Sequence, residues 1–359
     1  MAGGGQLNSE AIAAPLLAWF DAHKRDLPWR RTSDPYRIWI SEIMLQQTQV
    51  DRVIDYYERF IAAFPTVEAL AKAPIDDVLR LWEGLGYYSR ARNLHSAARA
   101  IVEQHGAEFP RSPEAIRALP GIGEYTAGAV LSIAFGVPAP AVDANVIRVL
   151  ARLFAIEGEV AKGAGRRRIA DLAAEVVPDD RPGDFNQALM ELGALLCISG
   201  RPGCLICPLG EVCAAKSRGL QDTIPPPKSQ AVKEVCAVAG VVRRADGRVL
   251  VARRPADGQW GGLWEFPNTH YDPGCAPEDA LTEHLADAFG LNVRVSAELA
   301  SFTYGVMNRR VALTVLSCAL ESGVATPSGH DEVRWATIAD LAEIALPSPH
   351  RTVAEILSG

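Results

Sequence analysis

The chain has 359 residues, of which 48% are hydrophobic and 22% are charged, and its formal net charge is −7. This apolar content excludes a mainly disordered chain, and the negative charge argues against a protein that coats nucleic acid through bulk positive charge. Two or more domains are expected at this length. Glycine and proline interrupt the uncharged run at residues 125–142, and the first residues, MAGGGQLNSE, contain no secretory signal. We therefore expect a cytoplasmic protein that does not bind or span a membrane.

Residues 7–222 are expected to form an almost entirely helical region. Asp34, followed by proline, is the N-cap expected at the start of the first clear helix. Apolar residues at helical spacing predict a second helix, which begins near Val50 and stops at Pro65. Prolines and glycines then separate several shorter helices.

Glu42 stands on an apolar face of the first helix. Ile38 and Trp39 lie one turn before it, and Leu45 lies one turn after it. A charged carboxylate is costly in such surroundings, so we expect Glu42 to be buried and its pKa to be raised, which suits a general acid near neutral pH. An exposed helical glutamate is the ordinary alternative.

Two further features of this region suit contacts with DNA. Gln46 and Gln47 are adjacent uncharged polar residues, and such side chains can read or replace a base. The loop Gly84-Leu85-Gly86-Tyr87 is made flexible by glycine, and Leu85 or Tyr87 can act as a wedge between base steps. A turn packed into the core is the alternative for this loop.

The sequence LPGIGEYTAGAV predicts a tight hairpin between two helices, with Gly121 and Gly123 in the turn. Exposed N–H groups there, with the start of the following helix, can bind one phosphate without any basic residue. This mode of binding reconciles an acidic chain with a nucleic-acid partner. A simple connection between helices is the alternative.

Asp143, in the sequence PAVDANV, is expected to be the N-cap of a helix that starts at Ala144. A carboxylate that receives N–H bonds at a helix start is favoured in its ionised form. A fixed anion at this position can stabilise a developing sugar cation.

Four of the seven cysteines fall within seventeen residues, with the spacing C-x6-C-x2-C-x5-C. Four thiolates so close in sequence can converge on one centre. Because only one pair has the tight spacing of a zinc knuckle and the flanking arms are long, we favour an iron–sulfur cluster over zinc, with buried free thiols as the other alternative. The expected ligands are Cys197, Cys204, Cys207 and Cys213.

Residues 223–233 contain three consecutive prolines and are expected to form a stiff, extended linker. The hydrophobic pattern after it changes to that of strands, which predicts a small α+β domain at residues 234–359. Strands are expected at residues 235–242, 248–252 and 310–320, and a helix at residues 278–289. The predicted fold class is therefore multidomain, with an all-α region followed by an α+β domain.

In this order the motifs resemble those of the helix–hairpin–helix DNA glycosylases that carry an iron–sulfur cluster, and specifically the adenine DNA glycosylases of the MutY family. The resemblance runs from about Leu16 to the last residues. It is carried by DLPWR, SEIMLQQTQV, WEGLGYYSRARNL, LPGIGEYTAGAV, PAVDANV, FNQALMELGALLC and the cysteine spacing. The resemblance implies a six-helix barrel module at about residues 31–136, a cluster module from about residues 7–30 and 137–222, and a Nudix-like recognition domain containing GLWEFP.

This resemblance implies a monomeric base-excision-repair enzyme with a [4Fe-4S] cluster, acting in the cytoplasm at the nucleoid. It would flip adenine that is mispaired with 8-oxoguanine or guanine out of double-stranded DNA and hydrolyse its N-glycosidic bond. Glu42 falls on the glutamate that protonates adenine N7, and Asp143 on the aspartate that stabilises the sugar intermediate. Tyr125 stands where bifunctional relatives carry a lysine nucleophile, which implies a monofunctional enzyme.

By the same resemblance, supporting roles fall on residues of three kinds. Those beside the catalytic pair are Tyr125 and Asn145. Those for base recognition are Gln187, at the edge of the extruded adenine, together with Trp29, Arg30 and Gln46. Those that bind, fill or wedge the duplex are Gln47, Leu85, Tyr87, Gly121 and Gly123.

The chain departs from the family pattern at two places. The helix EDALTEHLADAFG lacks the dense glutamates of a Nudix metal site, so we expect a recognition domain rather than a nucleotide hydrolase. At the loop where relatives use Phe-Ser-His to read 8-oxoguanine, this chain has Val306, Met307 and Asn308. Contacts from Arg309 and Arg310 are a conjectured substitute. We expect discrimination of 8-oxoguanine over guanine to be weaker in this chain, or to be achieved by other contacts.

Three other functions are compatible with parts of the sequence. An endonuclease III-like or thymine-mismatch glycosylase would share the fold and the cluster, but Tyr125, the glutamine pair and the appended domain argue against it. A DNA-binding redox sensor with an iron–sulfur cluster would need no catalytic pair. A structural zinc protein would differ from both in its optical spectrum.

Overall fold

The structure is a computed structural model that describes residues 9–226 and 231–359. Residues 7 and 8 of the expected helical region and residues 227–230 of the expected linker lie outside this part. The chain divides into two compact units. The first comprises Met1–Lys72 and Asn93–Lys228, and the second comprises Ala73–Arg92 and Ser229–Gly359.

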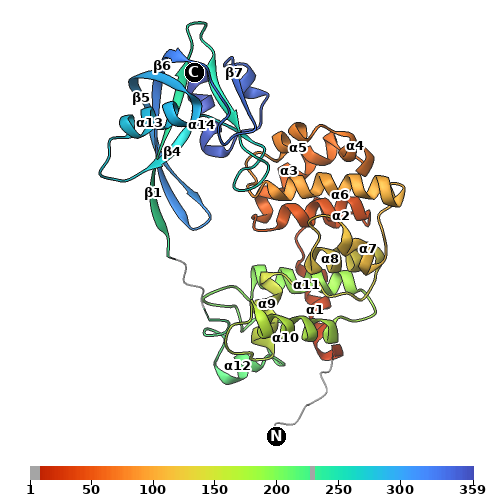
Figure 1. Ribbon diagram of the computed structural model, residues 1–359. Helices are drawn as coiled ribbons and strands as arrows, with labels where there is room; N and C mark the ends of the chain where they lie inside the picture. Colours follow the sequence, from red (N-terminus) through yellow and green to blue (C-terminus); the bar gives the residue numbers. More distant parts are fainter. Residues whose placement is uncertain (1–8, 227–230) are drawn as a thin grey trace. The chain divides into compact units, whose positions relative to one another are not determined.

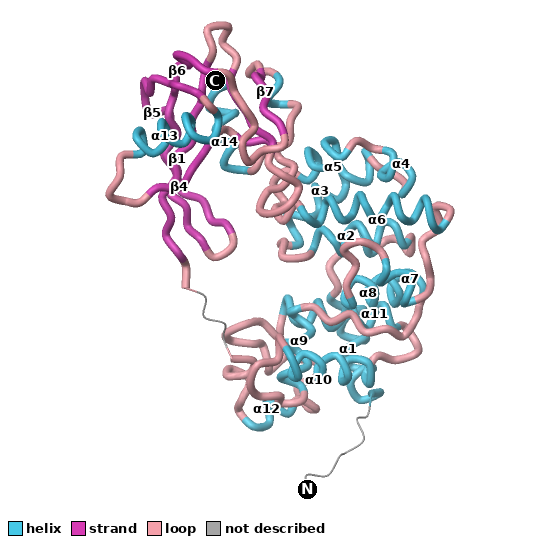
Figure 2. The backbone as a smooth tube through the Cα atoms, in the orientation of Figure 1, coloured by secondary structure: helices cyan, strands magenta, loops and turns pink. Residues whose placement is uncertain are grey.

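The first unit contains helices and no strand among its described residues, as predicted (Figures 1 and 2). Its elements are α1 (Ser9–His23), the 3₁₀ turn η1 (Pro28–Arg30), α2 (Pro35–Leu45), α3 (Val50–Ala63), α4 (Val67–Lys72), most of α6 (Ser89–His105), α7 (Pro113–Ala118), α8 (Glu124–Phe135), α9 (Ala144–Leu153), α10 (Gly163–Val176), α11 (Pro182–Leu195) and α12 (Ala214–Arg218).

The helix starts and stops follow the signals in the sequence. Asp34 accepts a hydrogen bond from the Tyr36 N–H at the start of α2, and Asp143 accepts one from the Val146 N–H at the start of α9. Gly136 ends α8 in the left-handed conformation, with φ of 66°. These capping predictions are confirmed.

The core that supports the C-terminal half of this unit lies between α1, α9, α10 and α11. Leu16 and Phe20 of α1 pack there with Leu150 of α9 and Phe185 of α11, although more than a hundred residues separate them in the chain. Such burial of large apolar side chains holds the ends of α9 and α11 in fixed positions.

The second unit is an α+β structure, as predicted. Its strands are β1 (Lys233–Arg243), β2 (Val249–Arg253), β3 (Trp264–Glu265), β4 (Asn268–Tyr271), β5 (Leu291–Val306), β6 (Arg309–Gly323) and β7 (Glu332–Ala336). Its helices are α5 (Ile75–Trp82), α13 (Pro277–Phe289) and α14 (Ser348–Ser358), with the short turn η2 (Asp340–Ala342).

One mixed sheet organises this unit, with the strand order β3-β2-β1-β6-β5. The central pair β1 and β6 is parallel, β4 pairs with β1, and β7 pairs with β2. Apolar clusters lie on both faces, one with side chains of α13 and the other with side chains of α14. A strand buried on both faces is apolar over a continuous run, which is why β1 and β6 are evident in the sequence.

The segment Ala73–Arg92 belongs to the second unit through polar contacts. Glu83, which follows α5, accepts two hydrogen bonds from the Arg351 guanidinium at 2.5 and 3.0 Å. Asp76 of α5 pairs with Arg253 of β2 at 2.7 Å. The loop that contains Leu85 and Tyr87 follows directly after Glu83.

Candidate active site

Glu42 of α2 is buried, with 5% of its surface exposed, which confirms the prediction of burial. The Tyr125 hydroxyl donates a hydrogen bond to Oε2 of Glu42. Burial raises the pKa of Glu42 to about 7, and the neighbouring charge of Asp143 acts in the same direction. The Tyr125 hydrogen bond and the Arg30 charge oppose that rise in the pKa. A carboxyl group with such a pKa can give up a proton near neutral pH.

Asp143 is the second carboxyl group of this site and the N-cap of α9. Its Oδ1 accepts the Val146 N–H at 2.7 Å, and its Oδ2 accepts the Asn145 side-chain amide at 3.0 Å. Burial raises the pKa of Asp143 above its ordinary value, whereas these hydrogen bonds lower it. The capping bonds offset burial only in part, so the net shift of the Asp143 pKa is upward, an effect of burial that the sequence alone did not reveal.

Tyr125 of α8 connects the acid to α11. Besides its bond to Glu42, the Tyr125 hydroxyl lies 3.4 Å from Met190 Sδ. Burial and the neighbouring Glu42 raise the pKa of Tyr125 well above its usual range, so this phenol stays neutral and keeps its proton for donation. Glu42, Tyr125 and Asp143 thus influence one another electrostatically from three different helices.

Gln187 and Arg30 are brought together by a buried anion that sequence analysis missed. The Arg30 Nε donates to Gln187 Oε1 at 3.3 Å, and its other nitrogens donate to Glu191 at 3.0 and 3.1 Å. Arg25 also binds Glu191, at 2.7 and 2.9 Å. Burial favours a raised pKa at Glu191, but the hydrogen bonds from the two arginines outweigh it and lower the pKa to about 2. Glu191 therefore remains an anion that orients Arg30 beside Gln187.

The other residues proposed for base recognition lie in different surroundings. Trp29 is buried, and its ring meets the Tyr57 ring edge-on at 5.4 Å, which is the geometry of a packing residue. Gln46 donates its amide to Thr126 Oγ1 at 3.2 Å and so ties the end of α2 to α8. The next residue, Gln47, is exposed and has a left-handed backbone, with φ of 56°.

The predicted hairpin precedes α8. Gly121 has φ of 72°, and a Cβ atom there would meet the Asn93 side chain at 2.5 Å, so only glycine fits without rearrangement. Gly123 is the N-cap residue of α8, is exposed and has open space on its Cβ side. Backbone N–H groups at this turn can therefore approach a phosphate closely.

The loop predicted to wedge the duplex lies in the second unit. Tyr87 is half exposed, at 49%, whereas Leu85 is buried, at 5%. Leu85 is therefore packed in this structure, and the exposed side chain of the pair is that of Tyr87. The carbonyl of Gly86 accepts hydrogen bonds from the Trp82 and Arg90 side chains, and these bonds stabilise the conformation of the loop.

The four clustered cysteines line one cavity, together with residues that include Arg152 and Lys216. Arg152 of α9 donates to the carbonyl oxygen of Cys197 at 3.2 Å and lies 3.3 Å from its Sγ. Burial raises the pKa of the Cys207 thiol to about 11. No group of three or more His, Cys, Asp or Glu side chains among the described residues is arranged around a single metal ion. A cavity lined by four thiols nevertheless fits a larger group that binds all of them.

Arg148 of α9 joins this cavity to the carboxyl site, which the sequence did not predict. Its Nη2 donates to Asn145 Oδ1 at 2.8 Å and to the Gly193 carbonyl at 2.7 Å, and its Nε donates to the Cys197 carbonyl at 2.7 Å. A Cβ at Gly193 would come within 2.6 Å of the Asn145 Cβ, so glycine permits this close packing of α11 against α9.

Comparisons with known proteins identify the family of this chain. The HhH-GPD superfamily of base excision DNA repair proteins matches residues 40–178, and a NUDIX domain matches residues 238–355. Adenine DNA glycosylase of Rattus norvegicus is 35% identical over 96% of this chain and 78% of its own length. The human enzyme is 33% identical over 97% and 74%, and that of Buchnera aphidicola subsp. Schizaphis graminum is 30% identical over 95% and 97%. This chain belongs to the adenine DNA glycosylase family.

The predicted family, enzyme class and fold class are thereby confirmed. Among solved structures, that of a thermostable thymine-DNA glycosylase is 32% identical, with a TM-score of 0.54, and covers 58% of this chain and 97% of its own. An endonuclease III–DNA covalent intermediate, at 23% identity and a TM-score of 0.51, shares the fold over 60% of this chain and 99% of its own. None of the helices in the described part of this family member has the length and hydrophobicity needed to cross a membrane.

Proposed function

We propose that this chain removes adenine mispaired with 8-oxoguanine or guanine in double-stranded DNA by hydrolysing the N-glycosidic bond. One observation carries the proposal: Glu42, with a pKa of about 7, interacts in one buried site with a second carboxyl group, that of Asp143. Two carboxyl groups in different environments are the means by which one site supplies both an acid and an anion.

Glu42 acts as the general acid. Adenine is a poor leaving group as an anion, and a proton on N7 lets it leave as a neutral base. The protonated form of Glu42 is favoured by burial, and its proton is available at neutral pH. After the bond breaks, the same carboxylate can take a proton from the attacking water.

Asp143 acts as the anion that stabilises the positive sugar. Its two oxygens are held by the Val146 N–H and the Asn145 amide, so the carboxylate cannot rotate freely. A fixed negative group facing a developing cation costs no reorganisation during the reaction. Asn145 is therefore a positioning residue.

Tyr125 supports a monofunctional reaction. A phenol with a raised pKa is a hydrogen-bond donor and cannot form the Schiff base through which a lysine drives strand cleavage. We propose that Tyr125 orients the Glu42 carboxyl group and that product formation stops at an abasic site.

Base and duplex contacts complete the proposal. Gln187, oriented by Arg30, contacts the edge of the extruded adenine. The N–H groups at Gly121 and Gly123 bind a backbone phosphate, and Tyr87, aided by Gln47, fills the duplex where the base leaves. Inserting such side chains offsets part of the stacking energy lost on flipping. For Leu85 a wedge role requires that the loop repack first.

We propose that Cys197, Cys204, Cys207 and Cys213 hold a [4Fe-4S] cluster. The shared cavity supports a common centre, and the close Arg152 guanidinium suits thiolates. The long arms of the cysteine spacing favour an iron–sulfur cluster over zinc. When bound, the cluster would fix the conformation of the loop that carries the four cysteines. That loop would then present basic residues such as Arg201 to the DNA backbone. Three further predictions remain part of this proposal. They are the domain boundaries (residues 7–222, 223–233 and 234–359), the monomeric state and a location at the nucleoid.

The test is single-turnover excision on duplexes in which adenine stands opposite 8-oxoguanine, guanine or cytosine. Adenine release from the first two and little from the third is expected. Release of thymine from a mismatch, or a covalent adduct trapped by borohydride, would instead support the related glycosylase reactions. Equal excision opposite 8-oxoguanine and guanine would show that Val306, Met307 and Asn308 do not discriminate the oxidised base.

A further inference from the structure

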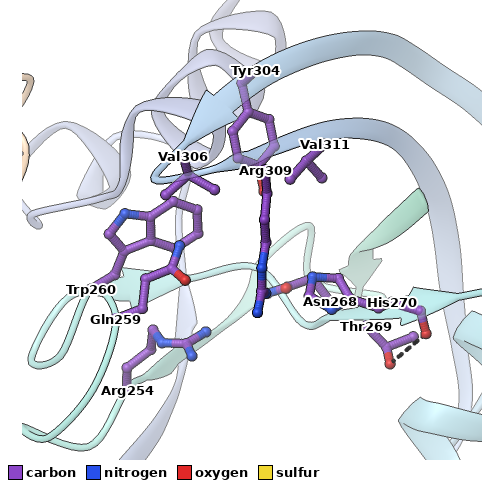
Figure 3. A pocket seen from close by; sticks show the side chains of 10 residues that line it. All are labelled: Arg254, Gln259, Trp260, Asn268, Thr269, His270, Tyr304, Val306, Arg309 and Val311. Atoms are coloured by element: carbon purple, nitrogen blue, oxygen red, sulfur yellow. Dashed lines mark hydrogen bonds between the residues drawn. The ribbon is translucent and has the colours of Figure 1, made fainter. Parts of the chain in front are cut away.

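A cavity of about 250 Å³ in the first unit is lined by Tyr125 of the catalytic site and by residues of α7, α8, α10 and the segment before α9. We call it the α8 cavity. It differs from the cavity on the sheet of the second unit, which contains Val306 and Arg309 of the loop expected to recognise 8-oxoguanine (Figure 3). The α8 cavity contains no residue for which the sequence predicted base recognition.

Two arginines and one glutamate give the α8 cavity its charge. Arg117 of α7 and Arg166 of α10 line it together with Glu124, the first residue of α8. Two positive charges and one negative charge leave an excess of one positive charge, in a chain whose net charge is −7. A local positive patch attracts an anion even when the whole chain is acidic.

Both arginines keep hydrogen-bond donors for a ligand. The Arg166 Nη2 donates to the Val142 carbonyl oxygen at 2.8 Å, which is the one hydrogen bond of its side chain within the described part of the chain. A guanidinium carries five N–H groups, so most of those of Arg166 are not used by this contact. Arg117 is exposed and lies 3.7 Å from the exposed carboxylate of Glu114. Exposed pairs of this kind are weak, and a phosphate can replace the carboxylate.

The other walls of the α8 cavity are uncharged. A Cβ at Gly128 would meet the Pro140 carbonyl oxygen at 2.0 Å, so glycine lets the segment before α9 pack directly on α8. The small side chains of Ala127, Ala139 and Ala170 also line the cavity and take up little of its space. An uncharged wall beside two guanidinium groups suits a sugar and its phosphate, which are the parts of DNA that proteins contact without reading sequence.

The place of the α8 cavity in the site favours a DNA strand as its ligand. Glu124 and Tyr125 follow the hairpin that is proposed to bind a phosphate, and Val142 precedes Asp143, which is proposed to face the sugar of the extruded nucleotide. A strand that reaches both places at once runs past the α8 cavity. The ligand assigned here therefore rests on the proposed function.

We propose that the α8 cavity binds one phosphate of the adenine-containing strand, next to the extruded nucleotide, through Arg166 and Arg117. The hairpin offers N–H groups without a basic residue, and Glu124 directly after it repels a phosphate. The two arginines supply the positive charge that the hairpin lacks. The competing explanation is a structural role, in which Arg166 only ties α10 to Val142.

The first test is the salt dependence of binding to a duplex in which a stable tetrahydrofuran abasic analogue stands opposite guanine. The affinity of the full chain is measured by fluorescence anisotropy between about 50 and 200 mM salt. Because one phosphate contact is lost, the double variant Arg117→Gln, Arg166→Gln should reduce the slope of log affinity against log salt by about 1 in magnitude. Binding at the lowest salt should weaken about fivefold or more. Arg166→Lys should retain the slope, since lysine keeps the charge.

The double variant Arg99→Gln, Arg168→Gln is the matched control. Arg99 of α6 lies 3.6 Å from Glu103 in an exposed pair like that of Arg117, and Arg168 is exposed on α10. Neither control arginine lines the α8 cavity, so the slope should stay that of the unchanged protein. An equal loss of slope in both double variants would overturn the proposal. So would a lower unfolding temperature of Arg117→Gln, Arg166→Gln with an unchanged slope, because that result indicates a structural role alone.

The second test locates the phosphate. An uncharged methylphosphonate replaces one phosphate of the abasic strand at a time, and each duplex is titrated with the unchanged protein and with Arg117→Gln, Arg166→Gln. At one linkage next to the abasic sugar the two changes should be non-additive, because each removes the same contact. Additive effects at every linkage would rule out this site. Normal binding without adenine excision would instead count against the proposed function alone.

Discussion

The Tyr125 hydroxyl donates a hydrogen bond to Oε2 of Glu42, a residue 83 positions earlier in the chain. This bond favours the ionised form of the carboxyl group and therefore lowers its pKa, while burial raises it. The pKa of about 7 is thus the result of two opposed effects. Removing one of these effects should change the pH at which the Glu42 carboxyl group loses its proton.

Tyr125→Phe should shift the pH dependence of excision. In the unchanged enzyme the rate should fall as pH rises through about 7, because the protonated acid is lost. Without the phenol the pKa of Glu42 should rise, so the alkaline limb should move to higher pH. The measurement is single-turnover excision between about pH 5 and pH 9, with DNA affinity as control. An alkaline limb that stays in place, or moves to lower pH, would contradict the role of this hydrogen bond.

Glu42→Gln should abolish most excision while DNA binding persists. A general acid contributes typically about 10²–10⁴-fold to a rate, and glutamine has no proton to give at N7. The amide keeps the size of the side chain and can still accept the Tyr125 hydrogen bond, so the mispaired duplex should bind with similar affinity. Full activity in this variant would refute the assignment of Glu42 as the acid.

The same variant should also change stability with pH. Glu42 has a folded-state pKa of about 7 against an ordinary value of 4.5, so the unfolded state releases its proton first as pH rises. Stability is lost between these two pH values, by about 3 kcal/mol in total. Glutamine does not titrate, so Glu42→Gln should unfold at a higher temperature than the unchanged protein above pH 7. Near pH 4 this difference in unfolding temperature between the two proteins should vanish. A stability difference that does not vary with pH would show that Glu42 is more solvated than the structure indicates.

Arg148→Gln should slow excision without weakening DNA binding to the same extent. Arg148 holds Asn145, which holds Asp143, and it also binds the carbonyl of Cys197. Residues that orient a catalytic or ligating group typically cost about 10–100-fold in activity when lost. A lower iron content per chain is expected as well, if the cysteines hold a cluster.

The matched control for this change is Arg168→Gln. Arg168 lies on α10 and is exposed, so its loss should alter neither excision nor iron content. Arg148→Lys should recover part of the activity, because lysine keeps the charge but not the fork of donors. If Arg148→Gln and Arg168→Gln have the same excision rate and iron content, the contacts of Arg148 with the carboxyl site and the cysteine cavity do not contribute to function.

The helices of the first unit could be predicted because their signals are local. Asp34 and Asp143 cap the helices that follow them, and Gly136 ends α8, so a few neighbouring residues are sufficient. The strand β5 was not predicted. Its two ends, residues 291–296 and 302–306, alternate in exposure, but the exposed stretch at residues 296–298 and the irregular pairing with β6 between residues 292 and 300 interrupt that alternation.

Glu191 shows why part of the site could not be predicted. Like Glu42 it is a glutamate on an apolar helix face, and spacing alone gives the two the same interpretation. Their pKa values move in opposite directions, because Glu191 meets Arg25 and Arg30, which lie 166 and 161 positions away. Leu85 is similar, since only tertiary contacts decide that it is buried while Tyr87 is exposed.

The pair Glu83–Arg351 should control the order of the segment that carries Tyr87. Arg351 donates to Glu83 at 2.5 and 3.0 Å and to the carbonyls of Leu341 and Ile344, and both charged side chains are mostly buried. Arg351→Met removes these donors and leaves the mostly buried Glu83 carboxylate with fewer hydrogen bonds, which costs about 1–3 kcal/mol. Amides of α5 and the following loop should therefore exchange hydrogen faster, as mass spectrometry of their peptides can measure.

A second ion pair of the same unit serves as the control. Arg334 and Glu332 on β7 lie 3.7 Å apart, and both side chains are nearly half exposed. Arg334→Met should leave exchange in the α5 peptides unchanged, because exposed pairs contribute little. In a cycle of Glu83→Gln, Arg351→Met and the double variant, we expect a coupling of about 1–2 kcal/mol. A coupling near zero, or equal exchange in both arginine variants, would mean that apolar packing alone holds this loop.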